Sequence, residues 1–193
     1  MNTSLLSKTA LGMALSAAAL FAHAETFSCA SGASQDCALA TASLSWAWDG
    51  TYFTLTNGGS GYVSEVYFDL GAGMAASFAN GVGTVSFAEG ANPGNLPGGS
   101  GVGFASDAAF DSDAGGKPIY GLNTGESATF KISGATLGSF AAGDVAAGVH
   151  IRSLVDSSAS VVTVSAVPEP QTYALMLAGL GAVGWVARRR SKA

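Results

Sequence analysis

Apolar and polar side chains alternate along several short stretches of this chain. Within 62–70, Tyr62, Val66, Phe68 and Leu70 fall on one face of an extended backbone, because successive side chains of a strand point to opposite sides. A strong hairpin signal, Asp49-Gly50, separates the first two stretches. The pattern predicts strands at 42–48, 51–56, 62–70, 82–88, 128–132, 147–151 and 161–166.

Glycine separates these stretches and argues against long helices. The chain has 27 glycines in 193 residues, about twice the usual share. Short strands joined by glycine turns are typical of an antiparallel β-sandwich. We therefore expect a single all-β domain over 25–166, with jelly-roll-like and immunoglobulin-like topologies both open. Two glycine-rich passages, 90–103 and 106–116, are expected to be surface loops.

The first residues of the chain have the pattern of a secretory leader. Lys8 supplies a short positive region, 10–22 is apolar, and Ala22-His23-Ala24 is an A-x-A cleavage site. We expect a Sec signal peptide over 1–24, cut by signal peptidase between Ala24 and Glu25. The domain would then be exported.

A second apolar segment, 172–187, has no charged side chain and is followed by Arg188, Arg189 and Arg190. As a helix it would be about 24 Å long, slightly shorter than a hydrocarbon core of about 30 Å. Because Lys and Arg are held on the cytoplasmic side, the arginines predict a transmembrane helix with the preceding domain outside. The alternative, a buried helix of a soluble domain, is disfavoured by the arginine cluster.

Val167-Pro168-Glu169-Pro170 stands just before that segment. A Pro-Glu-Pro motif, a spanning segment and a basic cluster, in this order over 167–193, resemble the PEP-CTERM sorting signal of Gram-negative bacteria. The resemblance implies that Pro168, Glu169 and Pro170 are recognised by an exosortase, a membrane enzyme of cysteine-peptidase-like chemistry. The helix would then be a transient anchor in the inner membrane. Family members are typically encoded alongside exopolysaccharide and biofilm systems. A permanent single-span anchor is the alternative.

Export determines the expected redox state of the two cysteines, Cys29 and Cys37. Disulfides persist in oxidising compartments, whereas two cysteines without neighbouring histidines make an incomplete metal site. We therefore expect a disulfide that ties down the start of the domain.

The domain over 25–166 is strongly acidic. Twelve Asp and Glu residues stand against Lys117, Lys131 and Arg152, so the formal charge is twelve negative less three positive, or −9. Nucleic-acid binding needs a basic face, and nucleic acid is therefore not an expected partner.

Candidates for catalysis or metal binding are few. His150 is the single histidine left after the leader is removed, which is too few for a three-ligand zinc site. We expect it to be an outward strand residue that bonds a loop. Asp107, Asp111 and Asp113 cluster, but Leu122 stands where an EF-hand would need its glutamate. A looser calcium site and a solvated acidic turn both stay open. No catalytic residue, metal ligand or cofactor is expected.

Trp46, Trp48 and Tyr52 flank the Asp49-Gly50 turn, and exposed rings there would be candidate glycan contacts. Trp46 and Trp48 share a face because they are two apart, so they are core residues if that face is inward. The sequence favours an exported, noncatalytic protein of the cell surface or extracellular matrix, sorted by exosortase and associated with exopolysaccharide or biofilm. A secreted carbohydrate-binding module is the alternative hypothesis.

Overall fold

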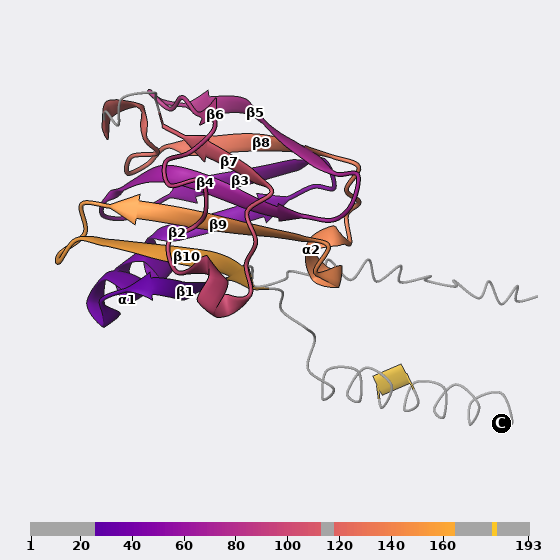
Figure 1. Cartoon of the computed structure of the whole chain (residues 1–193), viewed down its shortest axis with the longest axis horizontal. Helices are drawn as coiled ribbons and strands as arrows, with labels where there is room; N and C mark the ends of the chain where they lie inside the picture. Colours follow the sequence, from indigo (N-terminus) through magenta and orange to yellow (C-terminus); the bar gives the residue numbers. More distant parts are fainter. Residues whose placement is uncertain (1–25, 113–117, 165–178, 181–193) are drawn as a thin grey trace, which may run out of the picture.

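Two antiparallel β-sheets face each other across a hydrophobic core in the computed structural model (Figure 1). The structure describes residues 26–112, 118–164 and 179–180. The six-stranded sheet has the order β1 (Thr26–Gly32), β10 (Ser158–Val164), β9 (Val145–Arg152), β4 (Tyr62–Leu70), β7 (Ala108–Asp111) and β6 (Ala88–Glu89). The four-stranded sheet has the order β2 (Leu44–Trp48), β3 (Tyr52–Asn57), β8 (Ser127–Ser133) and β5 (Ala75–Val82).

Short helical segments join some of the strands in the described part of the chain. They are α1 (Ser34–Ser43), η1 (Gly99–Val102), η2 (Pro118–Tyr120) and α2 (Ser139–Ala142). The prediction of a β-rich domain built from antiparallel sheets is confirmed for these residues.

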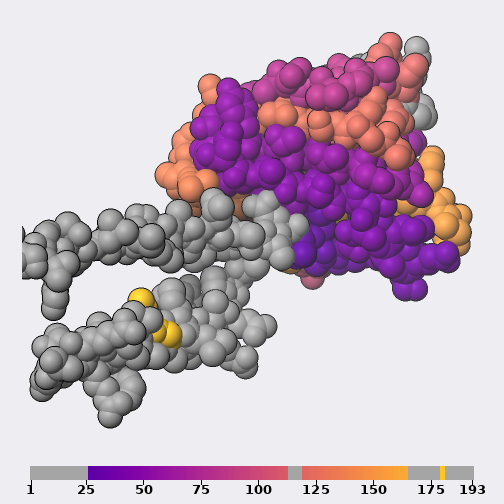
Figure 2. All heavy atoms as spheres, turned by 180° about the vertical axis from the view of Figure 1, so that it is seen from behind, coloured from indigo at the N-terminus to yellow at the C-terminus, as the bar shows by residue number. Residues whose placement is uncertain are grey.

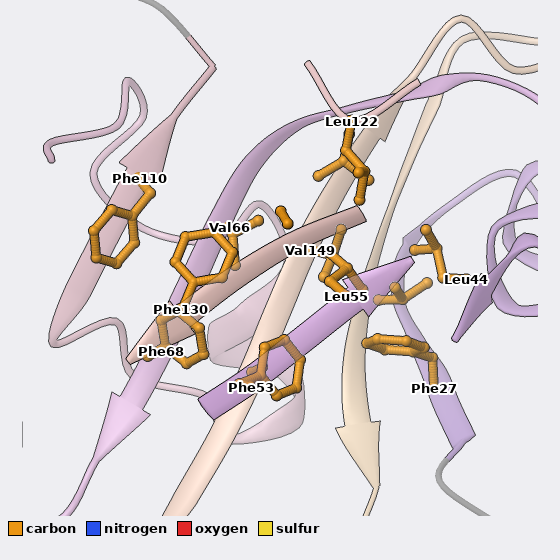
Figure 3. Packing of buried hydrophobic residues seen from close by; sticks show 14 of the residues in the cluster. Phe27, Leu44, Phe53, Leu55, Val66, Phe68, Phe110, Leu122, Phe130 and Val149 are labelled. Atoms are coloured by element: carbon orange, nitrogen blue, oxygen red, sulfur yellow. The ribbon is translucent and has the colours of Figure 1, made fainter. Parts of the chain in front are cut away.

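The core lies between the two sheets and is rich in phenylalanine (Figure 3). Phe53 of β3 and Phe130 of β8 both contact Phe68 of β4, with ring centroids 5.4 Å and 5.3 Å apart. Phe110 of β7 packs on Phe130 at 5.1 Å. Each of these side chains is at most 1% exposed. The alternation of apolar and polar residues in the sequence therefore corresponds to the two faces of these strands, since every second residue enters the core.

Most predicted strands are present, and the errors are of two kinds. The stretch 82–88 is not a strand: β5 ends at Val82, and Val85 and Phe87 reach the core from an irregular connection. Four strands, β1, β5, β6 and β7, were not predicted. Ala, Ser and Gly make up half or more of each of them, so they carry little apolar alternation of their own and form by pairing with neighbouring strands.

Part of the chain expected to be a surface loop instead packs over the outer face of the six-stranded sheet. We call residues 90–104 the covering segment. Its Leu96 and Phe104 are 4% and 9% exposed and form a second apolar cluster with Tyr67 of β4. Gly148 of β9 makes room for it, because a Cβ there would lie 2.7 Å from Leu96 Cδ2 and 3.0 Å from Phe104 Cζ. This part of the sheet is thus covered on both faces.

The predicted disulfide between Cys29 and Cys37 is present and joins β1 to α1, with the Cα atoms 5.5 Å apart. Beside it, Asp36 is fully buried. The Asp36 carboxylate accepts hydrogen bonds from the N–H groups of Asp156 and Ser157, at 3.1 Å and 3.0 Å, in the turn between β9 and β10. The disulfide and this carboxylate together fasten the first strand and helix to the β9–β10 hairpin.

Some predicted features lie outside the described residues. They are the leader over 1–24 with its cleavage point Ala24-Glu25, the motif Pro168-Glu169-Pro170, the cluster Arg188-Arg189-Arg190, and all of the segment 172–187 except 179–180. Residues 179–180 are helical. Among the described residues, no helix combines the length and apolar character needed to cross a membrane.

Candidate functional site

A row of polar side chains crosses the outer face of the six-stranded sheet. Ser160 of β10 lies opposite His150 of β9, His150 opposite Glu65 of β4, and Glu65 opposite Asp111 of β7. A β-bulge between Val63 and Glu65 sets this register. Without the extra residue of the bulge, Glu65 would share the core face with Val63, because alternate residues of a strand lie on the same side.

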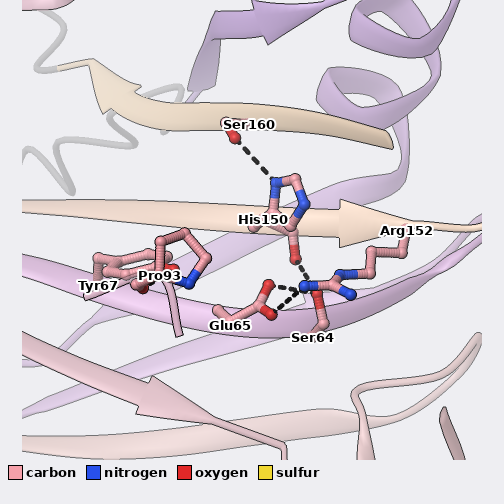
Figure 4. Close-up of polar contacts among 7 residues, drawn as sticks. All are labelled: Ser64, Glu65, Tyr67, Pro93, His150, Arg152 and Ser160. Atoms are coloured by element: carbon pink, nitrogen blue, oxygen red, sulfur yellow. Dashed lines mark hydrogen bonds and ion pairs between the residues drawn. The ribbon is translucent and has the colours of Figure 1, made fainter. Parts of the chain in front are cut away.

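Glu65 is 2% exposed, and its carboxylate is held by two neighbours (Figure 4). Arg152 Nη2 lies 2.5 Å from Oε1, and the Ser64 hydroxyl donates to Oε2. Burial raises the pKa of Glu65, although the Ser64 hydrogen bond and the Arg152 cation act in the opposite direction. The Arg152 side chain is 42% exposed, so the ion pair joins a buried anion to a cation that still meets solvent.

His150 uses its ring to bind a neighbouring strand. Its Nδ1 lies 2.9 Å from Oγ of the fully buried Ser160 (Figure 4). Burial, and secondly the Arg152 cation, lower the pKa of His150 to about 4, so the ring is neutral at neutral pH. The expectation that His150 bonds a loop is wrong, because its partner belongs to β10.

Most polar groups of the row are paired with one another, whereas Arg152 Nε is buried without a hydrogen-bond partner. Arg152 neutralises Glu65, the Ser64 hydroxyl is engaged by the carboxylate, and Ser64 Oγ also lies 3.3 Å from the His150 carbonyl. Pairing and hydrogen bonds of this kind offset the cost of removing the Glu65 carboxylate from water. The arrangement therefore acts as a clamp: its ion pair and hydrogen bonds hold β4, β9 and β10 together.

Strand β4, which carries Glu65, is also hydrogen-bonded to the covering segment. Tyr67 of β4 donates a hydrogen bond from its hydroxyl to the carbonyl of Pro93, at 2.9 Å (Figure 4). Burial raises the pKa of Tyr67, and the nearby carboxylate of Glu65 adds to this effect. The hydroxyl consequently stays protonated and available as a donor.

Sequence reasoning selected His150 from this network and missed Ser64, Glu65, Arg152 and Ser160. The alternation within 62–70 carries one usable signal, because it places Glu65 and Tyr67 on the face opposite Phe68. What it lacks is any sign that this outer face is covered. That depends on the covering segment, which is distant in sequence.

The three aromatic residues proposed as glycan contacts do not share one face. Trp46 and Trp48 are half-buried on the core side of β2 and pack on Phe140 of α2, with ring centroids 4.7 Å and 5.3 Å away. Tyr52 is 41% exposed and points from β3 to the opposite, outer side of the four-stranded sheet. A sugar stacked on Tyr52 would therefore not meet the indole rings.

The acidic residues considered for calcium have separate surroundings. Asp107 accepts a hydrogen bond from the Leu70 N–H, at 2.9 Å, whereas Asp111 lies on β7 opposite Glu65. Asp113 falls outside the described residues. Over the ranges that the structure describes, no group of three or more His, Cys, Asp or Glu side chains is placed to hold a metal ion.

Comparison with known proteins bears on the segment after the last strand. Residues 166–190 match the family model of the PEP-CTERM protein-sorting motif. No curated protein and no solved structure matches the chain. The matched range contains the predicted Pro168-Glu169-Pro170 motif, the apolar segment and the arginine cluster. The chain therefore carries a PEP-CTERM protein-sorting motif, which implies an exported protein with a C-terminal membrane-anchoring sorting signal and an exosortase as its processing partner.

Proposed function

We propose that this chain is a noncatalytic protein of the cell surface or extracellular matrix, delivered by exosortase sorting and associated with exopolysaccharide in a biofilm. The sorting motif at 166–190 is the observation that carries the proposal. Because β10 ends at Val164, the motif begins two residues after the last strand. The folded domain is the cargo of this signal.

The polar row supports the noncatalytic part of the proposal. Glu65, Arg152, His150 and Ser160 are the chemically versatile residues of the outer face, and each is engaged with a neighbouring strand. A general acid or base has to reach a substrate proton, whereas Glu65 is 2% exposed and already paired with Arg152. The strongly acidic composition of the domain is suited to staying soluble after release.

A carbohydrate-binding module is the second candidate function. One observation favours it: Tyr52 is 41% exposed on the outer side of the four-stranded sheet. The difference between the candidates is whether glycan recognition is the main role of the domain or one property of a matrix component.

The test of sorted delivery replaces Pro168, Glu169 and Pro170 with alanine. We expect export to continue but the variant to stay in the inner-membrane fraction, because the exosortase no longer recognises its signal. Fractionation of the native host, followed by intact-mass measurement, separates these states. Gln171→Ala, directly after the three replaced residues, is the matched control and should be sorted as the wild type is. Delivery of the triple variant at the wild-type level would contradict the proposal.

A further inference from the structure

The outer side of the four-stranded sheet forms an open face with an unusual composition. Residues alternate along its strands, so that Phe53, Leu55 and Phe130 enter the core and their neighbours point outward. Figure 2 shows this side, where β5, β8 and β3 lie next to one another as magenta, coral and purple bands. We call this surface the hydroxyl face; its polar residues are Ser45, Thr54, Thr56, Ser77, Asn80, Ser127, Thr129 and Ser133.

The hydroxyl face is regular because the strand register aligns its side chains. Thr54 lies opposite Thr129, and Thr129 lies opposite Asn80. The hydroxyl oxygens of Thr54 and Thr129 are 3.2 Å apart. Neighbouring strands of a sheet are about 4.8 Å apart, so donors and acceptors repeat at that spacing across three strands in a row, such as Thr54, Thr129 and Asn80. All of these side chains are exposed or half-buried.

The charge of this face differs from that of the domain as a whole. Among the outward residues of β2, β3, β8 and β5, all of which are described, there is no carboxylate, and Lys131 is the one charged side chain. The carboxylates of two acidic residues at its border accept hydrogen bonds from backbone N–H groups. Asp49 accepts from the N–H of Tyr52 at 2.7 Å, and Glu126 accepts from the N–H of Thr84 at 2.8 Å.

One aromatic ring stands on this nearly neutral surface. Tyr52 lies opposite Lys131 in the register and is 41% exposed. Its ring offers an apolar surface for stacking while its hydroxyl stays hydrated. The combination of dense hydroxyl groups, one aromatic ring and almost no charge matches a ligand that is itself uncharged and rich in hydroxyl groups.

We propose that the hydroxyl face binds a chain of neutral polysaccharide that lies across β3 and β8 and stacks on Tyr52. The proposal deepens the proposed function and rests on it, since a matrix role is what brings polysaccharide to this face. An acidic polymer would meet one cation, Lys131, and the carboxylates of the rest of the domain would repel it. A neutral chain meets no such repulsion.

The first test measures binding directly. The full-length chain is purified in a detergent without a sugar headgroup and run through native gels containing dextran or amylose, with cellulose fibres as an insoluble probe and alginate as the acidic one. We expect retention by at least one neutral polymer and none by alginate. Failure of every neutral polymer to retain the protein, or retention by alginate alone, would overturn the proposal.

The second test locates the binding surface. Thr54→Val combined with Thr129→Val removes two hydroxyl groups while keeping β-branched side chains. We expect affinity to fall about 30-fold, since each of the two lost hydrogen bonds contributes about 1 kcal/mol net and about 1.4 kcal/mol is a factor of ten. Tyr52→Ala should cause a loss of similar size. The control is Tyr120→Ala, because Tyr120 is 40% exposed but belongs to η2. Wild-type affinity in both face variants, each checked for folding by circular dichroism, would overturn the assignment.

Delivery distinguishes failure of this inference from failure of the proposed function. The face variants should be released from cells as the wild type is, because their sorting motif is intact. If delivery requires Pro168-Glu169-Pro170 but no neutral polymer is bound, the binding face is wrong and sorting stands. If the alanine variant of the motif is delivered normally, the sorting proposal fails irrespective of binding.

Discussion

The residues of the polar row show how a single inserted residue can decide the character of a sheet surface. The bulge between Val63 and Glu65 turns Glu65 outward, next to His150 and within 2.5 Å of Arg152. Glu65 and His150 are thus two titratable groups buried on the side of the sheet away from the core. Their ionisation consequently becomes linked to folding.

Stability should fall in mild acid because of His150. Its folded pKa of about 4 lies below the ordinary value of 6.5, so the unfolded chain takes up a proton that the folded protein does not. The associated stability is fully present above about pH 6.5 and is lost as the pH falls toward 4. At 1.36 kcal/mol for each pKa unit, the loss is about 3 kcal/mol.

Chemical denaturation between pH 7 and pH 4.5, with wild type and His150→Gln compared, measures this contribution. The variant should lose less stability over the range, because glutamine does not titrate. Glu65 acts in the opposite direction, since burial raises its pKa, but it is present in both proteins and is common to the comparison. Parallel stability curves for the two proteins would show that His150 is not the linked group.

At the scale of the structural elements, the packing of the covering segment on the sheet depends on Gly148 of β9. Gly148 leaves the space that Leu96 and Phe104 fill, and Tyr67 adds a hydrogen bond to Pro93. The segment contains little regular structure apart from the short η1. Its place on the sheet is therefore maintained by side-chain packing rather than by a hydrogen-bonded ladder.

Gly148→Val should loosen the covering segment. The added methyl groups would overlap Leu96 and Phe104, and overpacking of this kind typically costs about 1–3 kcal/mol. We expect a lower free energy of unfolding and faster hydrogen exchange of the amides in 96–104. Gly138→Val is the control, since a Cβ at Gly138 meets no atom within 4 Å. Unchanged exchange in the Gly148 variant would mean that the segment is held by other contacts.

At the scale of the whole molecule, the described domain begins and ends on paired strands. Thr26 of β1 lies directly opposite Val164 of β10. The segment that precedes the domain and the sorting motif that follows it therefore join the same end of the six-stranded sheet. Signal peptidase and exosortase would each act close to this end.

The mature protein from its native host should begin at Glu25 and end near Pro170. This prediction combines the expected signal-peptide cleavage after Ala24 with processing at the sorting motif. Intact-mass measurement of the extracellular fraction checks both ends at once. A species that keeps Arg188, Arg189 and Arg190 in the inner membrane would instead indicate a permanently anchored domain.

The main strands and the cysteine pair could be predicted because their signals are local. Alternation around Phe53, Phe68 and Phe130 marks strands wherever those strands lie in space, and two cysteines in an exported chain have few other partners. The same reasoning failed for 82–88. Val85 and Phe87 are apolar and alternate there, yet they fill the core from a connection between the sheets.

By itself, the sequence determined a β-rich fold, the disulfide and the PEP-CTERM sorting motif, since each of these is written in neighbouring residues. Only the tertiary structure decided which faces are covered. It buried Glu65 beside Arg152 and His150 beside Ser160. It also turned Trp46 and Trp48 onto Phe140 and left Tyr52 on an open surface. The physical reason is that strand alternation defines two sides of a sheet but not what packs against either, which depends on contacts between residues far apart in the chain.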